Sequence, residues 1–140
     1  MCLAGLVGGR VAGVPDRVLL LIAVGLLVVL WMVWIDPPST SSRRTSALAH
    51  TIGGILAGWA LVEALRRRIS DWLAVALLAL MAVTLLTVLW EFGEYAGDRL
   101  LETALVPRKR DSAEDIFFGA FGGAVGVAFG MVVASLRRGG

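Results

Sequence analysis

The feature that most constrains this chain is a set of long apolar runs. Residues 18–35 are all apolar or glycine, and a helix of that length covers about 27 Å, close to the hydrocarbon thickness of a bilayer. Three further apolar runs occupy residues 47–65, 72–92 and 113–136. Because lipid offers no partner for open backbone groups, runs this long are economical only as helices. The sequence therefore predicts an all-α fold, an integral membrane four-helix bundle.

Composition supports a membrane protein and excludes an ordinary soluble domain. The 140 residues are 58% hydrophobic and 17% charged, against about 45–50% and 25% in soluble domains. We expect a single transmembrane domain over residues 1–140, with a flexible N-terminal tail at residues 1–14 and a polar loop at residues 96–112. The net charge of +2 comes without a basic stripe interleaved with aromatics, so the expected partner is the lipid bilayer and not nucleic acid.

Orientation follows from the basic residues that flank the spans. With four spans both termini lie on one side, which carries seven Lys and Arg residues against six on the other. The positive-inside rule then places the termini in the cytoplasm by a small margin. Such a small margin keeps a small dual-topology transporter as an alternative, although no carboxylate lies near the centre of the predicted spans, where charge-coupled transport usually needs one.

Small residues recur at every fourth position on two of the predicted spans. The positions are Gly54, Gly58, Gly122, Gly126 and Gly130. This spacing lets helix backbones approach closely in lipid. We expect it to pack the second and fourth helices together, with a homodimer face or a docking face for a partner in a membrane complex as the alternative.

Acidic residues and the only histidine converge on one side of the membrane. The second helix begins there, the third ends there and the fourth begins there. Glu91 and Glu94 are spaced i,i+3, and Asp111 and Asp115 are spaced i,i+4, so each pair shares a helix face if its helix covers both residues. The candidate metal ligands are His50, Glu91, Glu94, Asp111 and Asp115.

Burial of this set in a membrane needs compensation. A charge at the centre of a span costs about 2.5–3.5 kcal/mol on insertion scales, and neighbouring carboxylates repel unless a cation, a proton or an arginine lies between them. Carboxylates with one imidazole suit a single divalent ion, either Mg²⁺, Mn²⁺ or Fe²⁺, or Zn²⁺ with His50 as nitrogen ligand. His50, Glu91 and Glu94 are also the candidate catalytic residues, because such groups perform acid and base chemistry.

A purely structural interpretation of the same acids stays open. Asp111, Glu114 and Asp115 could favour the start of the fourth helix through its dipole, with Ser112 as a cap. Neighbouring arginines would then neutralise the remaining charge. No nucleophile elbow, zinc-protease motif or phosphate loop occurs in the chain, so the sequence names no reaction and no organic cofactor.

Short motifs between Ser46 and about Gly126 are similar to those of the YjdF-like family of small bacterial inner-membrane proteins. They are His50 with Gly54, an acid 13 residues after the histidine before a basic cluster, the block Trp90-Glu91-Phe92-Gly93-Glu94-Tyr95, and the block Asp111-Ser112-Ala113-Glu114-Asp115. VanZ-like membrane proteins are a looser match. Family members tend to carry an aspartate where this chain has Ser46. Without that acid, the resemblance implies that Asp111 and Asp115 take its part in a metal site.

Three functional hypotheses follow. The first is a multi-pass protein of the bacterial inner membrane with a His/carboxylate pocket, suited to a divalent metal ion, at the extracytoplasmic interface; metal- or acid/base-assisted action would fall on a lipid headgroup or small solute. The second is a non-enzymatic accessory or packing subunit that uses its Gly/Ala helix faces. The third is the dual-topology transporter.

Overall fold

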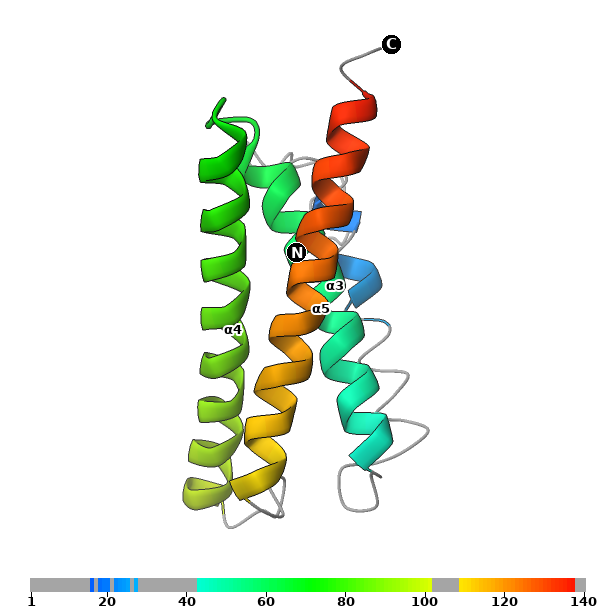
Figure 1. The fold of residues 1–140 in the computed structure, drawn as a ribbon. Helices are drawn as coiled ribbons and strands as arrows, with labels where there is room; N and C mark the ends of the chain where they lie inside the picture. The colour runs from blue at the N-terminus through cyan, green and yellow to red at the C-terminus, as the bar shows by residue number, and fades with distance from the viewer. Residues whose placement is uncertain are drawn as a thin grey trace, which may run out of the picture.

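Three long helices form the described core of the protein. They are α3 (Arg43–Leu65), α4 (Trp72–Leu101) and α5 (Lys109–Leu136). In the bundle α3 and α5 run in the same direction, and α4 runs in the opposite direction, from the end of α3 to the start of α5 (Figure 1). The computed structural model describes residues 16, 18–20, 22–25, 27, 43–101 and 109–137.

Three helices in this part of the chain are long and apolar enough to cross a membrane. The candidate spans are Arg44–Leu65, Trp72–Leu100 and Ser112–Leu136. Their outward faces carry large exposed hydrophobic side chains such as Leu73 and Met81, as contact with lipid requires. A membrane protein built from helices is therefore the architecture that length and composition support.

The first predicted span, residues 18–35, falls mostly outside the described residues. Those of its residues that are described, 18–20, 22–25 and 27, are helical. Val18 packs with Ala60 in a small apolar cluster on α3. The described chain thus contains three candidate spans, and the fourth of the predicted bundle still rests on the sequence.

The closest helix contact joins α3 and α5 through glycines on both helices. A Cβ atom at Gly54 would run into the carbonyl oxygen of Gly119, and one at Gly122 would run into that of Thr51. Gly58 and Gly126 meet backbone atoms of the facing helix in the same way. Only hydrogen fits at these positions, so the two backbones touch directly.

Helix α4 packs on this pair through small and branched side chains. Val62, Val75, Ala79 and Val127, from all three helices, form a buried cluster. One turn further along α4, Val83 lies against Gly123. These contacts fix the rotation of α4, and with it the face that α4 presents to α3 and α5.

The end of the bundle that holds the α3–α4 turn has its own polar contacts. Asp71 caps α4, because its Oδ1 accepts a hydrogen bond of 2.7 Å from the backbone N–H of Ala74. Arg137 donates to Glu63 at 2.7 Å and so connects the last turns of α5 and α3.

The helices extend further than the apolar runs that predict them. The expected polar loop at residues 96–112 is helical at 96–101, in α4, and at 109–112, in α5. Polar residues can continue a helix beyond lipid when they pair along it, as Arg99 does over the Tyr95 ring at 5.6 Å. Ser112 consequently lies inside the first turn of α5 and does not cap it.

Candidate functional site

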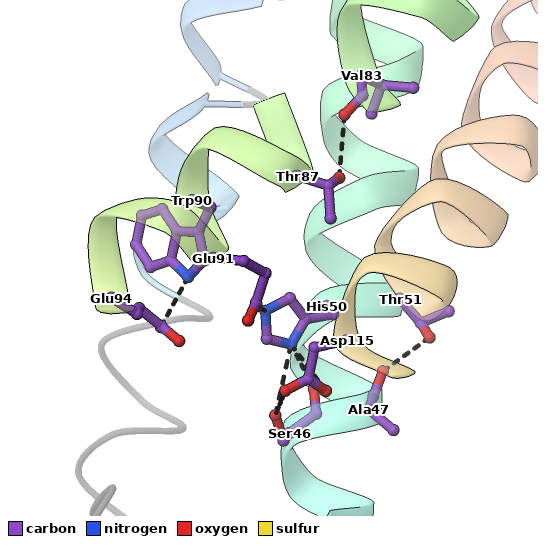
Figure 2. A network of polar contacts seen from close by, with 10 residues as sticks. All are labelled: Ser46, Ala47, His50, Thr51, Val83, Thr87, Trp90, Glu91, Glu94 and Asp115. Atoms are coloured by element: carbon purple, nitrogen blue, oxygen red, sulfur yellow. Dashed lines mark hydrogen bonds and ion pairs between the residues drawn. The ribbon is translucent and has the colours of Figure 1, made fainter. Parts of the chain in front are cut away.

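A cluster of one histidine and two carboxylates lies at the end of the bundle opposite the α3–α4 turn. This end gathers the start of α3, the last turns of α4 and the start of α5 (Figure 1). His50 comes from α3, Glu91 from α4 and Asp115 from α5, and all three side chains point toward one another (Figure 2). Each offers a ligand atom, and these atoms lie within 4.8 Å of one another.

The two ring nitrogens of His50 face different partners. Nε2 lies 3.0 Å from Oε1 of Glu91. Nδ1 lies 3.0 Å from the backbone carbonyl oxygen of Ser46, one turn earlier on α3, and 3.5 Å from Oδ1 of Asp115. The hydroxyl of Ser46 donates a 2.8 Å hydrogen bond to Oδ2 of Asp115.

The cluster is buried enough for its charge to matter. The exposed fractions are 15% for the side chain of His50, 5% for Glu91 and 14% for Asp115. Within the described residues, Oε1 of Glu91 is buried without a hydrogen bond of acceptable geometry, although Nε2 lies at ion-pair distance. A buried carboxylate in this position needs a proton or a cation close to Oε1, which either a protonated His50 or a bound metal ion supplies.

Apolar packing closes the site toward the centre of the bundle. Thr87 lies one turn before Glu91 on the same face of α4 and is buried. Its hydroxyl donates to the carbonyl oxygen of Val83 at 2.9 Å, and its side chain fills the space that a Cβ at Gly119 would need. The Thr87 hydroxyl therefore bonds its own helix, and the polar cluster ends at Glu91.

Of the two remaining predicted ligands, Glu94 has a partner outside the cluster. Oε1 of Glu94 accepts a 2.8 Å hydrogen bond from Nε1 of Trp90, and the pair lies apart from His50 (Figure 2). The backbone of Asp111 is in the first turn of α5, one turn before Asp115. Its side chain lies outside the described residues.

Ser46 has a larger part in the site than the sequence indicates. Its spacing of four residues places it above His50 on one helix face, and the structure adds its contact with Asp115 from α5. That contact joins two residues 69 positions apart in sequence, on different helices, so local spacing does not predict it. The bond from His50 to the Ser46 carbonyl uses the backbone, and any residue type at position 46 would offer the same oxygen.

The arrangement offers chemistry of two kinds. An imidazole nitrogen with two carboxylate oxygens is a donor set for a divalent ion of hard or borderline character. The same imidazole beside a carboxylate can also exchange a proton. Both kinds involve His50 and Glu91, two of the three candidate catalytic residues.

Comparison with known proteins adds no family to this geometry. No family model, no curated protein and no solved structure matches the chain.

Proposed function

We propose that this chain is a multi-pass protein of the bacterial inner membrane that binds one divalent metal ion at its extracytoplasmic edge, with His50, Glu91 and Asp115 as ligands. The observation that carries the proposal is the pair formed by Nε2 of His50 and the buried Oε1 of Glu91, 3.0 Å apart. Oε1 is buried, and Nε2 of His50 is the group that faces it in the described part of the chain. A cation bound between the two atoms satisfies both.

The distance suits two ligands of one ion. Zn²⁺ and comparable cations bind imidazole nitrogen and carboxylate oxygen at about 2.0–2.2 Å. Two ligand atoms at such distances, seen from the ion at a right or tetrahedral angle, are about 2.8–3.5 Å apart. Asp115 offers a third oxygen within 4.8 Å of the others, so a small inward movement of its carboxylate completes the set.

Three protein ligands leave coordination positions for something else. Metal ions with only structural roles are normally enclosed by four protein ligands, whereas reactive sites keep an open position for water or substrate. A water or an oxygen of a lipid headgroup or small solute would occupy that position here. Metal-assisted action on such a molecule is the activity that we propose for this site.

The placement of the motif residues also supports the proposed relation to the YjdF-like family. His50, Glu91 and Asp115 come from three of the motifs on which that resemblance rests. Among the described residues, these three side chains meet in space.

The Gly/Ala faces give less support to an accessory subunit. Gly54, Gly58, Gly122 and Gly126 lie against backbone atoms of α3 or α5 in the same chain. They are thus engaged in internal packing, and a partner would have to use other faces.

The proposal is tested by metal binding to the purified protein in mild detergent. Wild type, Glu91→Gln and a control variant, Glu63→Gln, are loaded with Zn²⁺, freed of excess metal and analysed for metal content and melting temperature. Glu63 is a carboxylate at the other end of α3, paired with Arg137. We expect stoichiometric Zn²⁺ and a metal-dependent rise in melting temperature for wild type and Glu63→Gln, and neither for Glu91→Gln.

Equal and negligible metal content in wild type and Glu91→Gln would overturn the proposal. Equal, stoichiometric content in both would also overturn it, because the metal would then bind elsewhere.

A further inference from the structure

The tautomer of His50 follows from its contact with a backbone carbonyl. The Ser46 carbonyl oxygen can only accept a hydrogen bond, and it lies 3.0 Å from Nδ1. Nδ1 therefore carries the proton in that bond. In the neutral ring this leaves Nε2 with its lone pair, and Nε2 is the nitrogen that faces Glu91.

With the ring neutral, the opposing groups on the Nε2 side need a proton or a metal ion between them. A lone pair on Nε2 and a carboxylate oxygen at 3.0 Å repel each other. Metal-ligating histidines show the same pattern as His50, because they normally donate the other ring N–H to a carbonyl or carboxylate, which fixes the ring orientation.

The hydroxyl of the same serine orients the second ligand. Ser46 Oγ donates to Oδ2 of Asp115 at 2.8 Å. The other oxygen, Oδ1, lies 3.5 Å from Nδ1 of His50. The hydroxyl bond thus holds the Asp115 carboxylate beside the His50 ring.

We propose that Ser46 is a positioning residue that orients two metal ligands at once, His50 through its carbonyl oxygen and Asp115 through its hydroxyl. The inference rests on the proposed metal site and specifies its donor atoms. These are Nε2 of His50 and Oε1 of Glu91, with a carboxylate oxygen of Asp115 as the third. Ser46 itself does not touch the metal.

The hydroxyl contribution is tested with three variants of the full chain. Ser46→Ala removes the hydroxyl, Ser46→Thr keeps one, and Thr51→Ala removes a hydroxyl on the same helix that bonds only the Ala47 carbonyl in the described structure. We expect Ser46→Ala to bind Zn²⁺ about 10- to 100-fold more weakly. Ser46→Thr and Thr51→Ala should bind as wild type does.

The carbonyl contribution is read directly from the ring nitrogens. His50 is the only histidine, so isotope-labelled histidine reports on one residue by NMR in detergent. We expect Zn²⁺ to shift the Nε2 signal while Nδ1 stays protonated, in wild type and in Ser46→Ala alike, because the variant keeps the carbonyl. A merely structural loss in Ser46→Ala would disperse or broaden this pattern instead.

The outcomes separate the two proposals. Zn²⁺ binding by wild type with no weakening in Ser46→Ala, or with the metal on Nδ1, overturns the role of Ser46 and leaves the metal site standing. Absence of Zn²⁺ binding by wild type overturns both.

Discussion

Two carboxylates one turn apart on α4 have different surroundings. Glu91 is 5% exposed and faces His50, whereas Glu94 accepts a hydrogen bond from Trp90 on an exposed part of the helix. We therefore expect Glu94→Gln to lower Zn²⁺ affinity by less than about tenfold. Glu91→Gln should lower Zn²⁺ affinity more strongly. We expect a loss greater than the 10- to 100-fold, roughly, that follows when a residue behind the metal ligands is replaced. Isothermal titration of Zn²⁺ into both detergent-solubilised variants makes the comparison.

Equal losses in the two variants would contradict this distinction and place Glu94 among the ligands. The sequence alone treats both acids as candidates, because a spacing of three residues places them within about 60° on the helix surface. Only the rotation of α4, fixed by buried contacts such as Val75 and Ala79, decides which acid faces inward.

At the scale of the elements, glycine contacts between α3 and α5 give a matched pair of substitutions. A Cβ at Gly54 would collide with the Gly119 backbone, while one at Gly53 meets nothing within 4 Å. We expect Gly54→Ala to destabilise the protein by about 1–3 kcal/mol, as overpacking does. Gly53→Ala should be neutral or stabilising by up to about 1 kcal/mol, because alanine favours helix. Thermal unfolding in detergent, followed by circular dichroism, measures both.

A Gly54→Ala variant as stable as Gly53→Ala would mean that α3 and α5 are not in backbone contact. A loss of Zn²⁺ binding in Gly54→Ala alone is the expected secondary effect, since Gly54 lies one turn from His50 and spreading the helices would separate His50 from Asp115.

Helix existence is predictable from this sequence, and helix ends are not. The runs at 47–65, 72–92 and 113–136 each correspond to a helix, because apolar length in lipid leaves no other structure. The ends of α4 and α5 lie beyond the apolar runs, at Leu101 and Lys109. Hydropathy detects where lipid contact stops, whereas a helix continues for as long as its polar residues can pair.

For the whole molecule, the path of the chain brings the site residues to one end. Each crossing reverses direction, so the start of α3, the last turns of α4 and the start of α5 lie together (Figure 1). This much follows from counting spans. The contact of Ser46 with Asp115 does not, because it depends on how closely the glycines let α3 and α5 approach.

The same path places the C-terminal end of α5 and the α3–α4 turn opposite the site, which makes orientation measurable. In a Cys2→Ser background, which removes the only cysteine, one cysteine is introduced at a time. Ala113 is exposed at the site end and Arg67 is exposed in the α3–α4 turn. If the site is extracytoplasmic, a membrane-impermeant thiol reagent labels Ala113→Cys in cells whose inner membrane is intact. Arg67→Cys should react only after that membrane is permeabilised.

The reverse pattern would place the site in the cytoplasm. Labelling of both cysteines before permeabilisation would instead indicate chains inserted in both orientations, as the dual-topology hypothesis requires. The arginines at 66–68 and at 137 and 138 favour a cytoplasmic location for the turn end, and acids such as Asp98 and Glu114 gather at the other. Because acids contribute little to orientation, the result depends mainly on these arginines. Replacing Arg66, Arg67 and Arg68 with glutamine leaves fewer basic residues on that side than on the other, and should therefore shift labelling toward the reverse pattern.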